Sequence, residues 1–559
     1  MGRLTRPGLL GITAIFAALT ILMTAPFSLH AASRVLSIGT DTDLMIWTLG
    51  WDVHAIVAQP LHLFDANIFY PHHGTLAYSE NLIGSVIVAA PVTWLTGNPV
   101  LAMNAVVLVA TMLCGVGGFV LGRKLELSTP ASMICGLVFA FTPPRLARLD
   151  QVHIATIQWI PFALAYLHGY LKAGRARDLR LAIAFFTLQA LTSGHGAAFL
   201  TLGVIVVLAV ALVRGAPLEP GRRLRDVGVA GAMLLLPVLW VYLPYRAAQQ
   251  DVGLRRPLND WSSLSWSSFV TSPSHVQDWL ISLLPASSIL RQPPSAWLFP
   301  GGLVIVLAAI ALWPRRSTPR SAPSASDARA TYVVMLLATL ALTAGPPYGI
   351  WRWLYWLPGL SFVRVPSRFF MLGLLALGVL AGYGFDRLAA GWAGRRRAIG
   401  AVVVSALLLG EFAFAPLDGV AFRADPPAAD RWLATQPTPF AVVDLPIPDS
   451  TNFVVRDRAA SAFMLHSMAH WQPMVEGYSG IQPPDYGDLY WPITRFPDEA
   501  SLRLLSQLHI RYAVVHPDLI PPTERAGFEE RVARWSTSLT LEHEDESGRV
   551  YSIHWPPGK

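Results

Sequence analysis

Long runs of apolar residues, separated by short polar connections, constrain this chain more than any other feature of its sequence. The first run contains no Asp, Glu, Lys or Arg between Arg6 and Arg34. Similar runs of roughly 17–25 residues follow, the length of an α-helix that crosses a hydrocarbon core about 30 Å thick. Of the 559 residues, 53% are hydrophobic and only 14% charged, which is outside the usual range for a soluble protein. We therefore expect a polytopic α-helical membrane protein.

The apolar runs predict about eleven transmembrane helices, with the N-terminus in the cytoplasm and the C-terminus outside. The first run is interpreted as an uncleaved signal anchor because it is longer than a usual signal-peptide core, and a cleaved signal peptide is the alternative. The predicted spans are 8–28, 100–122, 129–143, 153–171, 180–194, 196–213, 227–244, 298–313, 330–346, 369–386 and 398–416.

One further apolar segment, 82–96, is interpreted as a helix that lies at the outer membrane interface or dips partway in. Counting it as a span would place "GRKLE" (122–126) outside and invert every later loop. Leaving it out keeps Lys and Arg concentrated in short cytoplasmic connections, as the positive-inside rule expects. The formal net charge of +7 then follows from membrane topology, and no nucleic-acid partner is expected.

The character of the sequence changes near residue 418. We expect residues 1–417 to form the transmembrane domain, with a long first external loop at 29–99, and 418–559 to form a small external α/β domain. In the latter, "PFAVVDLPI" and "RYAVVHP" are typical of buried strands, and "EASLRLLSQLHI" is typical of an amphipathic helix. The stretch "LTLEHEDESGRVYSIHW" predicts a hairpin that turns at 546–548.

Acids and arginines gather in the predicted external loops, near the ends of spans. Glycosyl transfer needs a carboxylate to accept the acceptor's proton and cations to stabilise a phosphate leaving group. Arginine suits phosphate because its planar, permanently charged fork binds two oxygens. The candidates are Asp41 and Asp43 in "GTDTDLMIW", Glu80 in "YSENLIG", Arg145, Arg148, Asp150 and His153 in "TPPRLARLDQVH", His195 in "TSGHGA", and Arg364 and Arg368 in "SFVRVPSRFF".

Neither a metal site nor a disulfide is expected from the paired histidines and the two cysteines. No metal is expected at His72 and His73, because adjacent extended residues point in opposite directions. Cys114 and Cys135 lie inside apolar runs, so neither a disulfide framework nor a zinc site is expected. Each catalytic or binding candidate also has a purely structural interpretation. These are solvated loop acids at Asp41 and Asp43, a salt bridge from Asp150 to Arg148 or Arg145, a helix cap at Glu80, headgroup anchors at Arg364 and Arg368, and packed histidines at His153 and His195.

These loops resemble those of the membrane-embedded glycosyltransferases of the C superfamily, which includes aminoarabinose and protein mannosyl transferases and oligosaccharyltransferase. The likeness covers nearly the whole chain and is strongest to a bacterial group that shares "FVRVPSRF", "VDLP" and "VEGYSG". It implies a large first periplasmic loop with juxtamembrane helices, an acid in that loop as base (Asp41 or Asp43), Glu80 before an interfacial helix, and Asp150 as a second-loop acid. The sequon-binding "WWD" motif of oligosaccharyltransferase is missing from the sequence.

The resemblance implies a bacterial inner-membrane enzyme that transfers a hexosyl or pentosyl group from a polyprenyl-phosphate donor to an acceptor at the outer face of the membrane, with inversion. Arg364, Arg368, Arg145 and Arg148 would bind the donor phosphate, and His153, His195 and Tyr478 would contact substrate. No cofactor is expected, and membrane lipids are expected partners. The sequence leaves the sugar and the acceptor open. The alternative is a non-catalytic protein that binds or transports cell-envelope glycolipids.

Overall fold

The computed structural model describes residues 6–215, 220–252, 264–314, 327–345, 350–354, 363, 365–447 and 453–554. Arg364 and residues 315–326, most of the predicted cytoplasmic connection between the spans 298–313 and 330–346, lie outside these residues. The chain divides into two compact units, each described here by itself. Unit 1 comprises Met1–Ala31, Asn104–Val241 and Leu254–Gly419, and unit 2 comprises Ala32–Met103, Tyr242–Gly253 and Val420–Lys559. The predicted boundary between residues 417 and 418 is a different division and stays a prediction.

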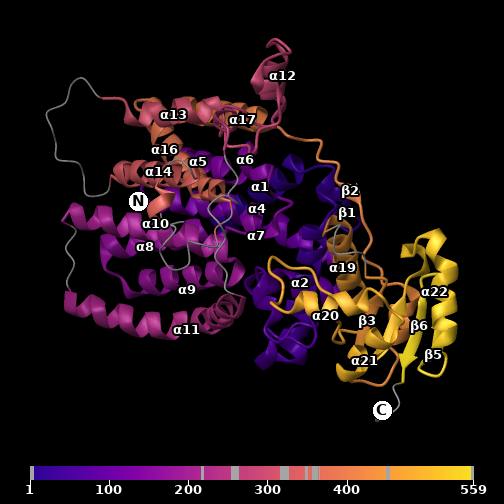
Figure 1. The fold of residues 1–559 in the computed structure, drawn as a ribbon. Coiled ribbons are helices and arrows are strands. Elements are labelled where there is room, and N and C mark those ends of the chain that lie inside the picture. The colour runs from indigo at the N-terminus through magenta and orange to yellow at the C-terminus, as the bar shows by residue number, and fades with distance from the viewer. Residues whose placement is uncertain are drawn as a thin grey trace. The chain divides into compact units, whose positions relative to one another are not determined.

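Unit 1 is helical, and a helix occupies the greater part of each predicted apolar run (Figure 1). Two of these helices, α4 and α11, have one end assigned to unit 2. The helices at the predicted spans are α1 (Arg6–Met23), α4 (Pro99–Lys124), α5 (Thr129–Phe141), α8 (Trp159–Ala173), α9 (Ala176–Thr192), α10 (Gly194–Val213), α11 (Pro220–Val252), α13 (Gly302–Leu312), α14 (Arg329–Thr343), α16 (Phe370–Leu388) and α17 (Gly394–Phe412).

Three helical segments among the described residues are long and apolar enough to cross a membrane: Pro99–Lys124, Gly194–Val213 and Pro366–Leu388. Several others are apolar but shorter, so the predicted count of about eleven spans is not confirmed. Short elements connect the helices of unit 1. These are η1 (Phe27–His30), α6 (Pro143–Leu146), α7 (Val152–Ala155), η6 (Trp266–Phe269), α12 (His275–Ser282), η7 (Ile289–Arg291), α15 (Trp351–Leu354) and η8 (Pro366–Phe369).

Helix α16 lies at the centre of unit 1 and packs against α5, α13 and α14. Its glycines explain how three helices approach it so closely. A Cβ atom added at Gly382 would lie 2.9 Å from the Ala131 carbonyl oxygen of α5, and one at Gly384 would overlap the backbone of Leu307 in α13. Small residues at helix contacts allow this backbone approach, which favours packing inside a bilayer.

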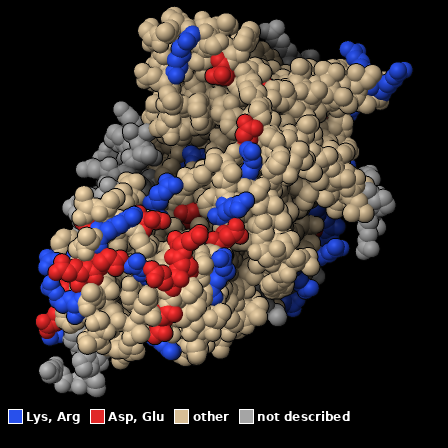
Figure 2. Space-filling view, turned by 90° about the vertical axis from the view of Figure 1, so that its right-hand side faces the viewer, with Lys and Arg blue, Asp and Glu red and all other residues tan. Residues whose placement is uncertain are grey.

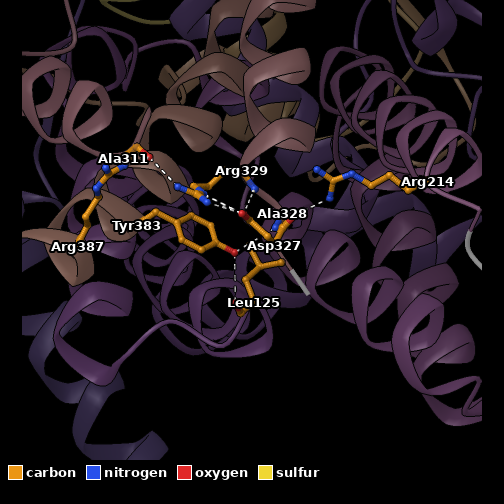
Figure 3. A network of polar contacts seen from close by, with 8 residues as sticks. All are labelled: Leu125, Arg214, Ala311, Asp327, Ala328, Arg329, Tyr383 and Arg387. Carbon is orange, nitrogen blue, oxygen red and sulfur yellow. Dashed lines mark hydrogen bonds and ion pairs between the residues drawn. The ribbon is translucent and has the colours of Figure 1, made fainter. Parts of the chain in front are cut away.

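A polar network joins the ends of several helices of unit 1 (Figure 3). The Arg329 guanidinium forms a bidentate pair with Asp327, and Arg214 donates to the Asp327 carbonyl oxygen. Arg387 and Arg329 both donate to the carbonyl oxygen of Ala311, at 3.2 and 3.0 Å. Because these arginines come from three different predicted cytoplasmic connections, the structure places those connections at one end of the helices (Figure 3). Which side of the membrane this end faces stays a prediction.

The first part of unit 2 comes from the predicted first external loop. Its main helix is α2 (Thr40–Ala58), and the interfacial segment forms η4 (Ile83–Ser85) and α3 (Val86–Thr96). Helix α3 ends at Gly97, whose φ of +64° is the left-handed conformation that favours glycine after a helix. Its 11 residues rise about 16 Å, too little to cross a bilayer. The remaining elements of this part are β1 (Arg34–Val35), η2 (Pro60–His62) and η3 (Thr75–Tyr78).

The C-terminal part of unit 2 contains a four-stranded sheet in the order β3-β4-β6-β5. Strand β3 (Ala441–Leu445) is parallel to β4 (Ile510–Val515), while β6 (Arg549–Ile553) is antiparallel to both β4 and β5 (Leu539–Glu544). The predicted strands, the amphipathic helix and the hairpin are thereby confirmed. The other elements are β2 (Val420–Ala421), which pairs with β1, and α18 (Ala428–Leu433), α19 (Phe453–Ser467), α20 (Tyr486–Ile493), α21 (Glu499–Gln507), η9 (Pro517–Leu519) and α22 (Pro522–Arg534).

The surface of this C-terminal part is rich in ion pairs. Arg549 in β6 pairs with Glu529 of α22 and with Glu544 of β5. On the face of the molecule that Figure 2 shows, most acidic side chains and many basic ones gather in one region, and further basic side chains lie apart from it near the edges. An aqueous environment suits such a surface, and the side of the membrane on which it lies stays a prediction.

The first external loop and the C-terminal part are joined by main-chain hydrogen bonds inside unit 2. The Met474 amide donates to the Asn67 carbonyl oxygen at 2.8 Å, and the Tyr70 amide donates to the Met474 carbonyl oxygen at 2.9 Å. The Phe69 amide donates to the carbonyl oxygen of Glu476 at 3.2 Å. Helix α19 also packs along α2 (Figure 1). Segments about 400 residues apart in sequence therefore form one structure.

Candidate functional site

The two aspartates of "GTDTDLMIW" both lie in the first turn of α2, after the extended residue Gly39. Free amide groups and the helix dipole at an N-terminus stabilise negative charge, so this position favours carboxylates. The sequence predicted two acids close to the end of a span, but not that they begin a helix. Their surroundings differ sharply, although only one residue separates them.

Asp41 is exposed and receives a hydrogen bond from the C-terminal part of unit 2. The Tyr478 hydroxyl donates to its Oδ1 at 3.1 Å. Burial raises the pKa of Tyr478, and the negative charge of Asp41 adds to this effect, so the phenol keeps its proton at neutral pH. An exposed carboxylate held by a neutral hydroxyl is able to accept a proton from an incoming group. Tyr478, predicted to contact substrate, lies beside a predicted acid.

Asp43 is buried, with 9% of its surface exposed. The Ser461 hydroxyl of α19 donates to its Oδ2 at 2.8 Å. Burial raises the pKa of Asp43, while the Ser461 hydrogen bond and the charge of Arg458 act in the opposite direction. Asp43 therefore connects α2 to α19, and its carboxylate is much less accessible than that of Asp41.

The segment that carries Glu80 is held from two sides. The Tyr245 hydroxyl accepts hydrogen bonds from the amide and the side-chain amide of Asn81, both at 2.8 Å, and donates to the Ser79 carbonyl oxygen at 2.8 Å. On the other side, the Leu82 amide donates to Asp52 Oδ2 at 3.1 Å. Glu80 is half-buried between these two attachments. Asp52, rather than Glu80, accepts the Leu82 amide hydrogen at the start of η4.

Asp52 is fully buried in the fourth turn of α2. Burial raises its pKa to about 8, and the hydrogen bond from Leu82 opposes the rise only in part. The side chain is therefore largely protonated at neutral pH. It fixes the beginning of the interfacial helix to α2, the helix that carries both candidate acids.

Unit 1 contains a cluster of basic side chains around Gln151. Arg148 donates to Gln151 Oε1 at 3.2 Å, and Arg368 donates to the same oxygen at 3.4 Å. Arg368 also donates to His195 Nε2 at 3.1 Å, which requires that this nitrogen carry no proton. The rings of His195 and His153 lie 5.3 Å apart. Four predicted residues are thus brought together, and we call them with Gln151 the basic cluster.

The other candidates of unit 1 are placed differently. Arg145 is 1% exposed, donates to the Ala155 carbonyl oxygen at 2.8 Å and lies over the ring of Phe139. These contacts are typical of a packing residue. Asp150 is exposed, and its charge partly offsets the fall in the pKa of Arg148 that burial causes. Arg364 lies outside the described residues.

Sequence reasoning missed several residues that hold these sites. Gln151 carries no charge, and Ser461 and Tyr245 stand in stretches that have no motif. Asp52 was visible as a loop acid, but only its position three turns into α2 shows its role. Helical periodicity starting at Thr40 would have placed Asp52 on this helix.

Within the described residues, no group of three or more His, Cys, Asp or Glu side chains is arranged to hold a metal ion. His72 instead pairs with Asp485 at 3.0 Å, and His73 lies 3.6 Å from Asp65. Cys114 and Cys135 are buried, unbonded thiols.

Comparison with solved structures identifies the fold. The chain resembles arabinofuranosyltransferase AftD from Mycobacteria with a TM-score of 0.60 and 15% identity, over 100% of this chain and 40% of AftD. It resembles the Archaeoglobus fulgidus oligosaccharyltransferase with a TM-score of 0.50 and 12% identity, over 92% and 70% of the two chains. ArnT from Cupriavidus metallidurans gives 0.49 and 15% identity, over 97% of each chain.

No family model matches the sequence, and the search of curated proteins finds no match. The fold comparison rests on AftD and the oligosaccharyltransferase, both glycosyltransferases by name. These two likenesses show that the chain shares its fold with membrane glycosyltransferase structures. The chain spans only 40% of the length of AftD. At these identities the comparisons establish architecture, and activity is argued separately.

Proposed function

We propose that this protein is a membrane glycosyltransferase that transfers one sugar from a polyprenyl-phosphate donor to an acceptor hydroxyl at the outer face of the membrane. The fold supports this assignment, since the solved structures it resembles are glycosyltransferases. The hydrophobic helices support a donor that resides in lipid. The different environments of Asp41 and Asp43 carry the mechanistic part of the proposal.

Asp41 is the base in this proposal, because it is exposed while Asp43 is buried with a raised pKa. As the acceptor oxygen bonds to the anomeric carbon from the side opposite the phosphate, Asp41 takes the hydroxyl proton. The bond between the anomeric carbon and the phosphate oxygen breaks, and its electron pair leaves with polyprenyl phosphate. Attack from the opposite side inverts the anomeric carbon.

The basic cluster is proposed to stabilise the donor phosphate. Arg148 and Arg368 present charged donors to a shared uncharged partner, Gln151, so neither charge is neutralised by that contact. Charge-assisted hydrogen bonds from such donors match a developing phosphate anion. His153 and His195 add further donors or acceptors. Arg364 keeps its predicted role as a third arginine, and Arg145 is assigned to packing.

Transport proteins often carry acidic residues inside their membrane spans, so such a residue would favour the transport alternative. Glu411 is an acid of this kind, since it lies inside the predicted span 398–416. Its carboxylate accepts hydrogen bonds from the amides of Gly302 and Leu303, the second at 3.1 Å. These amides begin α13, so Glu411 caps a helix. This contact gives Glu411 a structural role and favours the transferase over the transporter.

Sugar transfer in lipid nanodiscs tests the proposal. Purified protein is incubated with polyprenyl phosphates bearing different pentoses and hexoses, together with membrane extract, and released polyprenyl phosphate is measured. We expect Asp41→Asn to lower the rate by about 10²–10⁴-fold, the usual contribution of a general base. Asp518→Asn is the control, since this side chain is 91% exposed on the C-terminal part. Wild-type transfer by Asp41→Asn would exclude Asp41 as base, and a folded protein inactive with every donor would favour the glycolipid-binding alternative.

A further inference from the structure

A cavity of about 440 Å³ lies in unit 2, at the end of α2 away from the two candidate acids. It is lined by residues of α2, the end of α3, the start of α4 and the end of α19 with the segment after it. The side chains are aliphatic or aromatic apart from Thr93 and His54, and none is a carboxylate, lysine or arginine. Burial lowers the pKa of His54, so its ring is neutral at pH 7. The lining therefore suits an uncharged, apolar ligand.

The rim of the cavity is unusually apolar for a surface. Val57 and Trp94 line the cavity and are 67% and 66% exposed. Further exposed apolar residues accompany them in the same helices, among them Ile87 and Leu95, at 63% and 85%. Exposed apolar patches mark contact with membrane or ligand. The cavity therefore opens beside an apolar surface on α3, the helix predicted to lie at the membrane interface.

The cavity and the buried acid Asp43 lie along the same contact between α2 and α19. Asp43 bonds Ser461 at one end, Gly50 faces Met468 in the middle, and His54 stacks on Trp471 at the other end, with ring centroids 4.8 Å apart. A Cβ atom at Gly50 would lie 2.6 Å from the Met468 methyl group, so glycine permits this close approach.

Helical geometry places the cavity within reach of the acids. Asp43 and His54 are 11 residues apart, about three turns, so they lie on one face of α2 with a rise of about 16 Å between them. A ligand held in the cavity by an apolar chain is thereby placed along the face of α2 that leads to Asp43 in the first turn, while Asp41 lies in the same turn on a different face. The base acts on the acceptor hydroxyl, so a ligand that extends from the cavity to this first turn is the acceptor rather than the donor.

We propose that the cavity holds one hydrocarbon chain of a lipid acceptor, such as an acyl chain of a membrane glycerolipid, and so makes the acceptor a lipid. This inference rests on the proposed function. The chain enters from the bilayer between Val57 and Trp94, and the head group of the lipid extends along α2 toward Asp41.

Photolabelling of the full-length protein in nanodiscs tests the binding of a chain. The probes are a phosphatidylglycerol with a diazirine in one acyl chain and a polyprenyl phosphate with a diazirine in its chain. We expect the acyl probe to label peptides containing residues 46–58 or 465–471. Val57→Glu should lower this labelling about tenfold, because it brings a charge to the entrance. Leu61→Glu is the matched control, since Leu61 is 85% exposed nearby but does not line the cavity.

Labelling by the polyprenyl probe alone, or no labelling by either probe, overturns the proposal. An equal loss of acyl-probe labelling in Val57→Glu and Leu61→Glu also overturns it, because this result would report contact with the membrane surface and not entry into the cavity. Mass spectrometry of lipids after incubation with donor tests the acceptor, and Val57→Glu should reduce sugar-bearing lipid to the same degree as labelling. Sugar found only on protein or soluble glycan overturns the inference and leaves the transferase standing. Acyl labelling with no sugar transfer to any acceptor overturns both.

Discussion

The acidic residues of unit 2 and the basic cluster of unit 1 are assembled in different ways. Asp41 and Asp43 are bonded by hydroxyl groups that lie 437 and 418 positions later in the chain. In the basic cluster, Arg148 bonds a residue only three positions away, and the other contacts come from helix ends nearby in unit 1. The acids therefore depend on the joining of two distant chain segments, whereas the cluster depends on helix packing. Substitutions that affect one site should leave the other unchanged.

After the loss of the base Asp41, removing a cation of the basic cluster should give the largest effect. We expect Arg368→Ala to lower kcat/KM for sugar transfer by about 10²–10³-fold, as loss of a group that stabilises a developing anion does. Arg368→Lys should recover only part of this loss, because an ammonium group lacks the bidentate fork. The control is Arg525→Ala, a partly exposed arginine of the C-terminal part. Unchanged kinetics in Arg368→Ala, with a normal melting temperature, would remove the cluster from the mechanism.

The contact between the predicted first external loop and the C-terminal part, both inside unit 2, is called the junction here. Disturbing this junction should give the next largest effect. A Cβ atom at Gly477 would lie 2.8 Å from the ring of Phe69, which is only 1% exposed and has no room to move. We expect Gly477→Ala to destabilise unit 2 by about 1–3 kcal/mol, the usual cost of overpacking. Gly487→Ala is the matched control, because a Cβ atom there has nothing within 4 Å. Equal unfolding midpoints for the two variants would contradict the described packing of "VEGYSG" against the first loop.

The junction also shows where sequence reasoning stops. The lengths of the apolar runs located the helices, and short continuous apolar stretches located β3 and β4, because both patterns follow from burial of the whole element. The basic cluster was partly predictable, since its arginines and histidines stand in loops at span ends. The partners of Asp41 and Asp43 were not, because a hydroxyl 400 residues away leaves no periodic trace. Whether each acid is buried depends on that contact, so the sequence left Asp41 and Asp43 equivalent.

Stability should depend on pH through Asp52. Its pKa in the folded protein is raised from 3.8 to about 8, so the folded state holds a proton that the unfolded state releases. The stabilisation is complete below pH 4 and is lost as pH rises to about 8, by at most about 1.4 kcal/mol per pH unit. Asp52→Asn should melt with a flatter pH profile between these limits, whereas Asp518→Asn should run parallel to wild type. Parallel profiles for Asp52→Asn and wild type would show that Asp52 is ionised in the folded protein.

The smallest effect is expected from loss of the hydrogen bond between Asp43 of α2 and Ser461 of α19. Ser461→Ala removes the hydroxyl that donates to Asp43, and loss of one buried hydrogen bond should cost about 0.5–1.5 kcal/mol. The same bond opposes the rise in the pKa of Asp43, so its loss should raise that pKa further. The stability deficit of Ser461→Ala relative to wild type should therefore grow as pH rises through the ionisation of Asp43, since the variant must ionise this buried acid without its partner.

Ser536→Ala, at an exposed serine of the C-terminal part, controls for the loss of a hydroxyl. The basic cluster serves as the internal reference, because its contacts do not involve α19 and donor affinity should match wild type. A deficit that is independent of pH would mean that Ser461 only packs against Asp43. A deficit that grows with pH, together with intact donor binding, would show that the Ser461 hydroxyl of α19 favours the ionised form of Asp43 on α2 and leaves the basic cluster unchanged.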